Sequence, residues 1–263
     1  MKKVALKVGT NTFYAVHKLK SMVTFIGETY VAFLKALLNP KKIRWRETLF
    51  YMNLCGFEAL PIILLICFLM GLILGIQAAF ILAQWGTEVF MADMIGLVIV
   101  KELGPLMVAI IATGRCGSAF AAEIGTMKVN EEVNAITTMG LEPSRFLVVP
   151  KLIAMLIAMP LLTAFGNLSG LLGGFSVGFF QLDIPAVTYY QRTVNMVSIM
   201  DFSEGMIKSI CFAVLVTVIG CMSGFDAKDD AQGVGRATTS AVVNGIFVII
   251  VCDTVLALLF NLI

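Results

Sequence analysis

The sequence predicts an all-α integral membrane protein: five transmembrane helices, an amphipathic interfacial helix before them, and a short cytoplasmic coupling helix between the second and third spans. The first observation is composition, since 59% of the 263 residues are hydrophobic and 14% are charged, with a mean hydropathy of +0.94. Soluble domains are far less apolar. The second is a series of apolar stretches near or above the roughly 20 residues that cross a bilayer as a helix. The third is the position of ten of the nineteen Lys and Arg before residue 47.

The amino-terminal segment, residues 1–47, predicts a basic helix that lies in the membrane interface. Apolar residues recur every three or four positions from Leu19 to Leu38, with lysines between them. This spacing places the apolar side chains on one helix face and turns the basic groups toward lipid phosphates. A secretory signal would need an uninterrupted apolar centre and a small-residue cleavage site, and neither is present. We therefore expect the segment to be retained.

Five apolar stretches are expected to span the membrane, at residues 59–84, 94–122, 146–180, 206–224 and 240–263. Gly71 and Gly75 in the first form a GxxxG pair, which favours close helix packing. The third has a glycine at every fourth position, and these glycines form a smooth groove where another helix, from this chain or from a second copy, should lie. The glycines are Gly166, Gly170, Gly174 and Gly178. Between the spans remain a loop at 123–145, a mixed-polarity connector at 181–205 and a loop at 225–239.

The distribution of basic residues predicts the orientation. With the amino terminus in the cytoplasm, the basic amino-terminal segment and the loops at 123–145 and 225–239 all lie on the cytoplasmic side. Only Arg192 and Lys208 then lie outside, with Lys101 inside the membrane. Because cytoplasmic loops carry an excess of Lys and Arg, this arrangement is the expected one. Five spans then place the carboxyl terminus in the periplasm.

Lys101 and Glu102 are charged residues inside the second span, roughly 10 Å from its outer end at 1.5 Å per residue. Each costs about 2.5–3.5 kcal/mol to insert, so both should face a polar cavity or each other. Pro105 removes the hydrogen-bond donor for the carbonyl of residue 101 and predicts a kink there. This combination indicates a polar functional site, and the competing interpretation is that the two residues neutralise neighbours at a helix interface. At the inner end of the same span, Arg115 and Glu123 are expected to form structural salt bridges.

The segment 123–141 predicts a short amphipathic helix in the cytoplasm. Val129, Val133, Ile136 and Gly140 share one face, and Gly140 followed by Pro143 is a helix stop. An apolar face between two spans needs a surface to contact. From the pattern alone, the helix either lies on the membrane or inserts into a partner protein.

Several chemistries have no sequence support. There is no GxxxxGK[ST] phosphate loop, HExxH or GxSxG, so the chain is not expected to hydrolyse a nucleotide or act as an enzyme. The six cysteines are scattered and His17 is the one histidine, so neither a disulfide nor a metal site is expected. We expect no cofactor in this chain and no nucleic-acid partner.

The stretch from Lys101 to Lys151 resembles the MlaE/YrbE permease family, the membrane subunits of ABC systems that move phospholipid between bacterial membranes with MCE-domain proteins. The resemblance rests on ELGP at 102–105, GRxGSA at 114–119 and AEIGxM at 122–127. It extends from LGIQ at 74–77 to GFDA at 224–227 and GVGRATT at 233–239. These elements cover nearly the whole chain, so the resemblance implies a single permease domain over 1–263.

The resemblance implies an inner-membrane homodimer that holds phospholipid between its subunits and maintains the lipid asymmetry of the outer membrane. It further implies cytoplasmic ABC ATPase subunits that bind ATP and Mg, a periplasmic MCE ring and, in some systems, a small STAS-type regulatory subunit. The coupling helix would contact the ATPase through Glu123, Lys128, Glu131, Glu132, Val133 and Ile136. The lipid-lining residues would be Leu74, Gln77, Trp85, Lys101 and Glu102. Lys101 stands where the family commonly has arginine, and a lysine cannot make the bidentate phosphate contact of a guanidinium.

Two alternatives remain from the residues themselves. One is an ion-coupled secondary transporter in which Glu102 is the titrating group. The other is an intramembrane thiol enzyme that uses Cys116.

Overall fold

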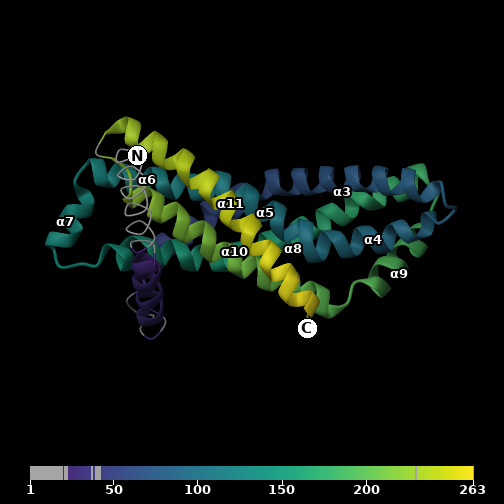
Figure 1. Ribbon diagram of the computed structural model, residues 1–263, viewed down its shortest axis with the longest axis horizontal. Helices are drawn as coiled ribbons and strands as arrows, with labels where there is room; N and C mark the ends of the chain where they lie inside the picture. Colours follow the sequence, from purple (N-terminus) through teal and green to yellow (C-terminus); the bar gives the residue numbers. More distant parts are fainter. Residues whose placement is uncertain (1–19, 21–22, 37, 39–42, 229, 263) are drawn as a thin grey trace, which may run out of the picture.

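The computed structural model describes residues 20, 23–36, 38, 43–228 and 230–262, and these residues contain helices and no strand. Five of the helices in this part are long and apolar enough to cross a membrane: residues Trp45–Ala83, Glu88–Val129, Ser144–Gln181, Ile199–Phe225 and Ala231–Phe260. The first four run roughly along the long axis of the molecule, and the last, Ala231–Phe260, crosses the others diagonally (Figure 1). The predicted all-α membrane fold with five spans is confirmed.

The first span is longer than the sequence predicted. It consists of α2 (Trp45–Cys55), a 3-10 turn (Phe57–Ala59) and α3 (Leu60–Ala83), so it starts at Trp45 and not at residue 59. Because α2 contains charged residues, the prediction began only at residue 59, although this helix buries Thr48, Tyr51 and Cys55 on one side. Before it, residues 23–36 are helical, and residues 1–19 of the predicted interfacial segment lie outside the described residues. The interfacial role of this helix stays a prediction.

The helix of the second span is continuous and contains two π turns. After a 3-10 turn (Glu88–Phe90) it continues through α4 (Met91–Val98), a π turn (Ile99–Leu103), α5 (Gly104–Ala112), a second π turn (Thr113–Gly117) and α6 (Ser118–Val129). Pro105 follows Gly104 at the start of α5, and because it has no N–H it leaves one carbonyl of the preceding turn without a helical donor. At the position of the predicted kink the helix forms a π turn, with the Gly104 N–H bonded to the Ile99 carbonyl.

The prediction of one helix over 123–141 was wrong. The spanning helix continues to Val129, and a separate short helix, α7 (Glu132–Thr138), follows a break at Glu131, whose φ of 61° is left-handed. A non-glycine residue in that conformation ends a helix. The loop between the second and third spans is therefore shorter than residues 123–145.

The last three spans also begin earlier than predicted. They are a π turn (Ser144–Val148) with α8 (Val149–Gln181), then α10 (Ile199–Phe225), then α11 (Ala231–Leu262), with α9 (Ala186–Met196) between the first two. Ser198 and Asp201 form a capping box that starts α10 well before residue 206. Consequently the predicted connector at 181–205 and loop at 225–239 are both partly helical.

The glycine-rich face of α8 packs against helices of the same chain. A Cβ atom at Gly71 of α3 would lie 1.9 Å from the Gly170 carbonyl oxygen, and one at Gly173 would lie 2.1 Å from the Phe68 carbonyl oxygen. Gly174 and Gly178 face Tyr189 of α9, and Gly166 faces α3 and α5. The predicted helix packing in the groove is confirmed, and α3, α4, α5 and α9 of this chain contact its glycines.

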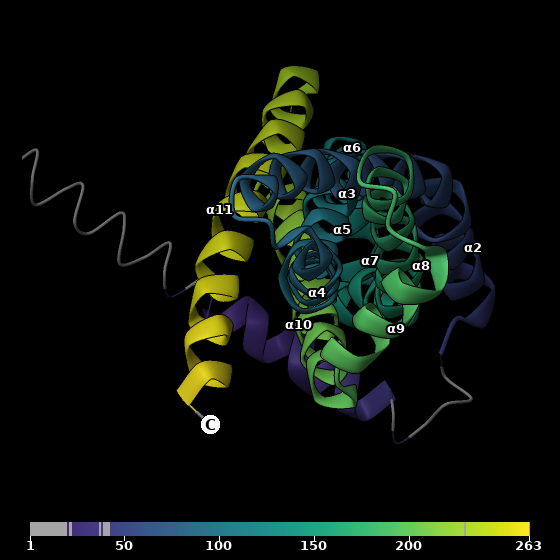
Figure 2. The same ribbon diagram turned by 90° about the vertical axis from the view of Figure 1, so that its right-hand side faces the viewer.

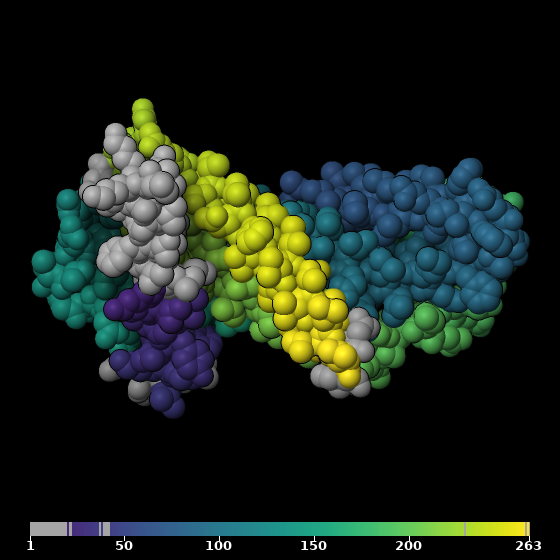
Figure 3. Space-filling model, in the orientation of Figure 1, coloured from purple at the N-terminus to yellow at the C-terminus, as the bar shows by residue number. Residues whose placement is uncertain are grey.

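The two ends of the molecule differ. The turn between α3 and α4 and the helix α9 lie at one end, whereas α7 and the described amino-terminal helix lie at the other (Figure 1). Viewed along the long axis, α11 lies to one side of the other spans (Figure 2). It crosses one face of the molecule diagonally (Figure 3) and exposes a row of apolar side chains, Val243, Phe247, Ile250, Val251, Val255, Leu258 and Leu259.

Candidate functional site

The first π turn carries Lys101 and Glu102 and turns them toward different partners. Successive residues of a helix point about 100° apart, so the two side chains cannot share one partner easily. In the structure they do not pair with each other: Lys101 contacts acids of α10, and Glu102 contacts a lysine of α10. π turns occur frequently at functional sites. Each residue thus meets opposite charges on a neighbouring helix, which is the arrangement of the competing interpretation, and their role as a functional polar site stays a prediction.

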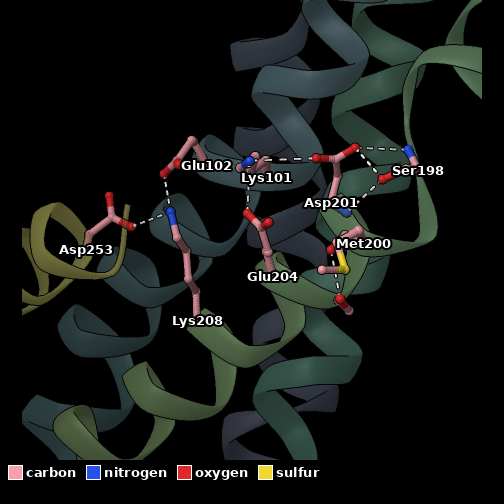
Figure 4. A network of polar contacts seen from close by, with 9 residues as sticks. Lys101, Glu102, Ser198, Met200, Asp201, Glu204, Lys208 and Asp253 are labelled. Carbon is pink, nitrogen blue, oxygen red and sulfur yellow. Dashed lines mark hydrogen bonds and ion pairs between the residues drawn. The ribbon is translucent and has the colours of Figure 1, made fainter. Parts of the chain in front are cut away.

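Helix α10 supplies the partners from one of its faces. Asp201, Glu204 and Lys208 are spaced by three and four residues, which places them on one side of a helix. Lys101 Nζ lies 3.0 Å from Glu204 Oε2 and 3.7 Å from Asp201 Oδ1. Lys208 Nζ is ion-paired with Glu102 (Figure 4). Two charged residues of the second span are thus matched by a charged stripe on the fourth.

Asp253 of α11 completes the cluster. Its Oδ1 lies 3.2 Å from Lys208 Nζ, so Lys208 bridges two carboxylates from two different helices (Figure 4). The Lys208 side chain is fully buried, whereas that of Glu102 is 32% exposed. We name these six residues the charged cluster: Lys101, Glu102, Asp201, Glu204, Lys208 and Asp253. It contains four carboxyl groups and two ammonium groups, which is an excess of acid in the apolar part of the fold.

Only Lys101 and Glu102 of this cluster stand out in the sequence as a candidate site. The pattern alone places Asp201 and Glu204 in the extramembrane connector 181–205 and Lys208 among the outside charges. The signal was available: DFSEGMIK has charges at i, i+3 and i+7, and Asp253 is a lone acid in an apolar span. Ionisable residues inside a span are functional candidates by default, with the partner to be sought on a neighbouring helix.

Gly205 determines how closely α10 approaches the π turn. A Cβ atom there would lie 2.4 Å from the Val100 carbonyl oxygen, so a side chain would push the two helices apart. We expect Gly205→Ala to separate Lys101 from Glu204 and to reduce transport at least fivefold, with a small loss of stability. The measurement is transport in vesicles alongside thermal unfolding in detergent. Gly235→Ala is the control, since nothing lies within 4 Å of its added Cβ. Unchanged transport by Gly205→Ala would show that the cluster tolerates a wider spacing.

The other predicted lining residues lie on α3 and the turn after it. Leu74 is half-buried, Gln77 is exposed, and Trp85 is 77% exposed in the turn before α4. In the described part of the chain no hydrogen bond or ion pair joins these three to the charged cluster. Their role as lipid-lining residues stays a prediction.

A second polar cluster lies toward the α7 end and includes a predicted coupling residue. Glu123 accepts hydrogen bonds from Tyr51 Oη (2.5 Å) and from Lys151 Nζ (3.1 Å), and Lys151 is fully buried. Arg115 pairs with Glu58 at 3.0 Å. A structural salt bridge was the role expected for Arg115 and Glu123, and in the structure each of them forms one with a separate partner. Glu123 therefore links α6 to Tyr51 of α2 and to Lys151 of α8.

The remaining predicted coupling residues divide into two groups. Lys128 Nζ donates to the carbonyl oxygens of Phe225 (2.8 Å) and Ala227 (2.7 Å), so it caps the carboxyl end of α10. On and beside α7, Ile136 is buried and Val133 is half-buried, while Glu131 and Glu132 are exposed. Of these residues, only Glu131 and Glu132 are fully available to a partner. Met139, which was not among the predicted coupling residues, is 72% exposed next to them.

The thiol hypothesis loses its support. Cys116 is 1% exposed, and its sulfur lies 3.9 Å from the Cys55 carbonyl oxygen within the main core. A nucleophile must reach its substrate, and this one is enclosed by packed side chains.

Comparisons with known proteins give a consistent result. Residues 48–259 match the family described as permease MlaE. The chain is 37% identical to a probable ABC transporter permease protein of Rickettsia prowazekii over 205 residues, 78% of this chain and 79% of that protein. It is 33% identical over 230 residues to the intermembrane phospholipid transport system permease protein MlaE of Haemophilus influenzae, covering 86% and 88%. It is also 33% identical to the chloroplast protein TRIGALACTOSYLDIACYLGLYCEROL 1 of Arabidopsis thaliana over 227 residues, covering 83% and 63%.

Proposed function

The chain belongs to the MlaE permease family, and from this membership we propose that it is the permease subunit of an ABC system that moves phospholipid between the inner and outer membranes of a bacterium. The observation that carries the proposal is the family match over residues 48–259, which includes nearly all of the five spans. The similarity to a phospholipid transport permease over 86% of the chain supports the substrate class. In this proposal the chain is a multi-pass inner-membrane protein with a cytoplasmic amino terminus, and its work maintains outer-membrane lipid asymmetry.

We place the lipid beside the charged cluster, between two copies of the chain. Lys101 is the accessible cation of the cluster, because 19% of its side chain is exposed and Lys208 is fully buried. An ammonium group can bind a headgroup phosphate as a point charge. Glu204 and Asp201 compete for the same ammonium, so a phosphate would bind and leave without a large barrier. Leu74, Gln77 and Trp85 are proposed to contact the acyl chains and the headgroup region.

The coupling surface is proposed to be the exposed side of α7 and its flanks, at the end of the molecule away from the α3–α4 turn (Figure 1). We define this surface as Glu131, Glu132 and Met139. A partner ABC ATPase would bind ATP and Mg and would move α7. Because Glu123 ties α6 to Lys151 of α8, movement of α7 would reach two spans at once. A periplasmic MCE ring and a STAS-type subunit complete the proposed assembly.

We expect the double substitution Glu132→Lys and Met139→Asp to reduce capture of the ATPase at least tenfold. It reverses one charge and places another at an exposed apolar contact, and a charge left unpaired in an interface is costly. Co-purification from a strain that expresses both subunits measures the effect. The control is Thr138→Ser, a conservative exposed change on the same helix. Equal capture by both variants would place the ATPase contact elsewhere.

Reconstitution tests the function as a whole. Vesicles that contain the chain and its ATPase should transfer a fluorescent phospholipid when ATP is supplied, and a hydrolysis-deficient ATPase should stop the transfer. The secondary-transporter hypothesis, which rests on Glu102, predicts the opposite dependence: transfer without ATP that stops when the proton gradient collapses. Transfer by the chain alone would overturn the proposed function.

A further inference from the structure

A cavity of about 370 Å³ lies between the described amino-terminal helix and the connection from α7 to α8. Its walls include Ala36 of the amino-terminal helix, Arg44 just before α2, and Arg145 and Phe146 at the start of the third span. It lies apart from the charged cluster, at the end of the molecule that carries α7. Nothing in the proposed transport route uses it.

The two arginines of this cavity have different surroundings. The Arg44 guanidinium donates to Glu47 Oε1 at 2.9 Å and stacks 4.0 Å from the centre of the Phe146 ring, so its position is fixed. Arg145 is half-buried, and its side chain has no hydrogen bond or ion pair with any residue in the described ranges. A guanidinium carries five N–H donors. In a partly closed cavity, these donors and the positive charge favour an anionic ligand.

The remaining polar wall limits which anion fits. Glu142 is the carboxylate among the lining residues, and its Oε1 lies 4.0 Å from Lys35 Nζ. Since Arg44 is paired with Glu47 and Glu142 lies near Lys35, Arg145 is the guanidinium among the described lining residues that has no carboxylate partner there. The other walls, among them Ile43, Phe146 and Val149, are apolar. This combination fits a molecule that has a phosphate and an apolar portion together.

The position of the cavity relative to the spans indicates the source of such a molecule. Arg44 directly precedes the segment Trp45–Ala83, and Arg145 is the second residue of the segment Ser144–Gln181. Both arginines therefore lie at the α7-side ends of two membrane-spanning helices. The neighbouring helix 23–36 exposes Val23, Ile26, Tyr30 and Leu34. It contacts the same connection through Ser144 Oγ, which donates to Glu28 Oε2 at 3.5 Å. A helix with an exposed apolar face beside the ends of two spans belongs at the lipid surface.

We propose that this cavity binds the phosphate of an anionic phospholipid from the leaflet on the α7 side, with Arg145 as the principal contact and Arg44 as the second. A guanidinium and a phosphate form a paired, charge-assisted contact, and basic pockets beside spans suit lipid headgroups. The bound lipid would link the amino-terminal helix to the connection that follows α7. It would thereby be a site distinct from the transported lipid.

Photocrosslinking tests the proposal on the full-length chain in nanodiscs. The probe is phosphatidylglycerol with a photoreactive group near the headgroup, and the crosslinked peptides are identified by mass spectrometry. We expect label on peptides that contain residues 140–150, and we expect Arg145→Gln to reduce it at least fivefold. Arg46→Gln is the matched control, because it removes an exposed arginine of the same region that does not line the cavity. Its label should stay within twofold of the parent.

Three results would overturn the proposal. Equal loss of label in both variants would indicate general charge attraction to the membrane. Full competition by glycerol 3-phosphate at lipid-equivalent concentration would indicate a site for a soluble phosphate. Loss of label when the ATPase is bound would indicate that an acidic segment of a protein partner occupies the cavity. Thermal unfolding of Arg145→Gln within a few degrees of the parent excludes a folding defect, and if that variant unfolds, Arg145→Lys should show an intermediate loss of label.

Discussion

Replacing Lys208 by alanine is expected to destabilise the protein by about 3–5 kcal/mol and to reduce phospholipid transfer at least tenfold. Lys208 is fully buried and bridges Glu102 and Asp253, so its removal leaves two carboxylates facing each other without a cation. Breaking a buried ion pair from one side has this order of cost, because the remaining charge stays buried. Thermal unfolding in detergent and vesicle transfer measure the two effects. Lys228→Ala, at an exposed position between α10 and α11, is the control.

A neutral replacement of the whole bridge separates structure from function. The triple variant Lys208→Met, Glu102→Gln and Asp253→Asn keeps the approximate side-chain shapes and removes every charge of the bridge. Replacing a complete buried ion network by neutral groups is often tolerated. We therefore expect most of the stability to return while transfer stays low. If transfer also returns, the Lys208 bridge only holds α10 in place, and lipid handling would rest on Lys101 with Asp201 and Glu204.

The five spans could be predicted from the sequence because the length of an uncharged apolar stretch indicates a membrane-spanning helix without reference to any other segment. Boundaries were less accurate wherever charged residues lie on a helix that continues through them. Trp45–Cys55 and Ile199–Gly205 are the clearest cases: both contain acids, and both are helical. A hydropathy pattern averages over all helix faces, whereas the acids of α10 lie on the face that meets Lys101.

The candidate site was predicted only in part, because one partner of each ion pair lies on another helix. Lys101 and Glu102 could be found because they interrupt an apolar run. Their pairing with Glu204 and Lys208 depends on how α10 packs, and that packing depends on Gly205. The same limit applies to Lys128, which resembled an exposed coupling residue and caps α10 in the structure.

Placing a leucine at Gly71 is expected to prevent α3 from packing on α8 and to abolish the folded protein. A Cβ atom at this position would lie 1.9 Å from the Gly170 carbonyl oxygen, which is backbone and cannot move aside as a side chain can. Overpacking typically costs 1–3 kcal/mol, and a backbone clash between two long helices should exceed about 3 kcal/mol. Gly71→Ala should give a smaller loss in the same direction. The yield of monodisperse protein and its thermal unfolding report both effects.

The control compares the same substitutions at a glycine without neighbours. Gly235 lies near the start of α11, and nothing is within 4 Å of its added Cβ. Alanine has a higher helix propensity than glycine by up to about 1 kcal/mol, so Gly235→Ala should be neutral or stabilising. Opposite signs for Gly71→Ala and Gly235→Ala would show that contact, and not propensity, determines the result. If Gly71→Leu folds with near-normal stability, the two helices must be able to separate, and α3 would then be a movable wall of the lipid route.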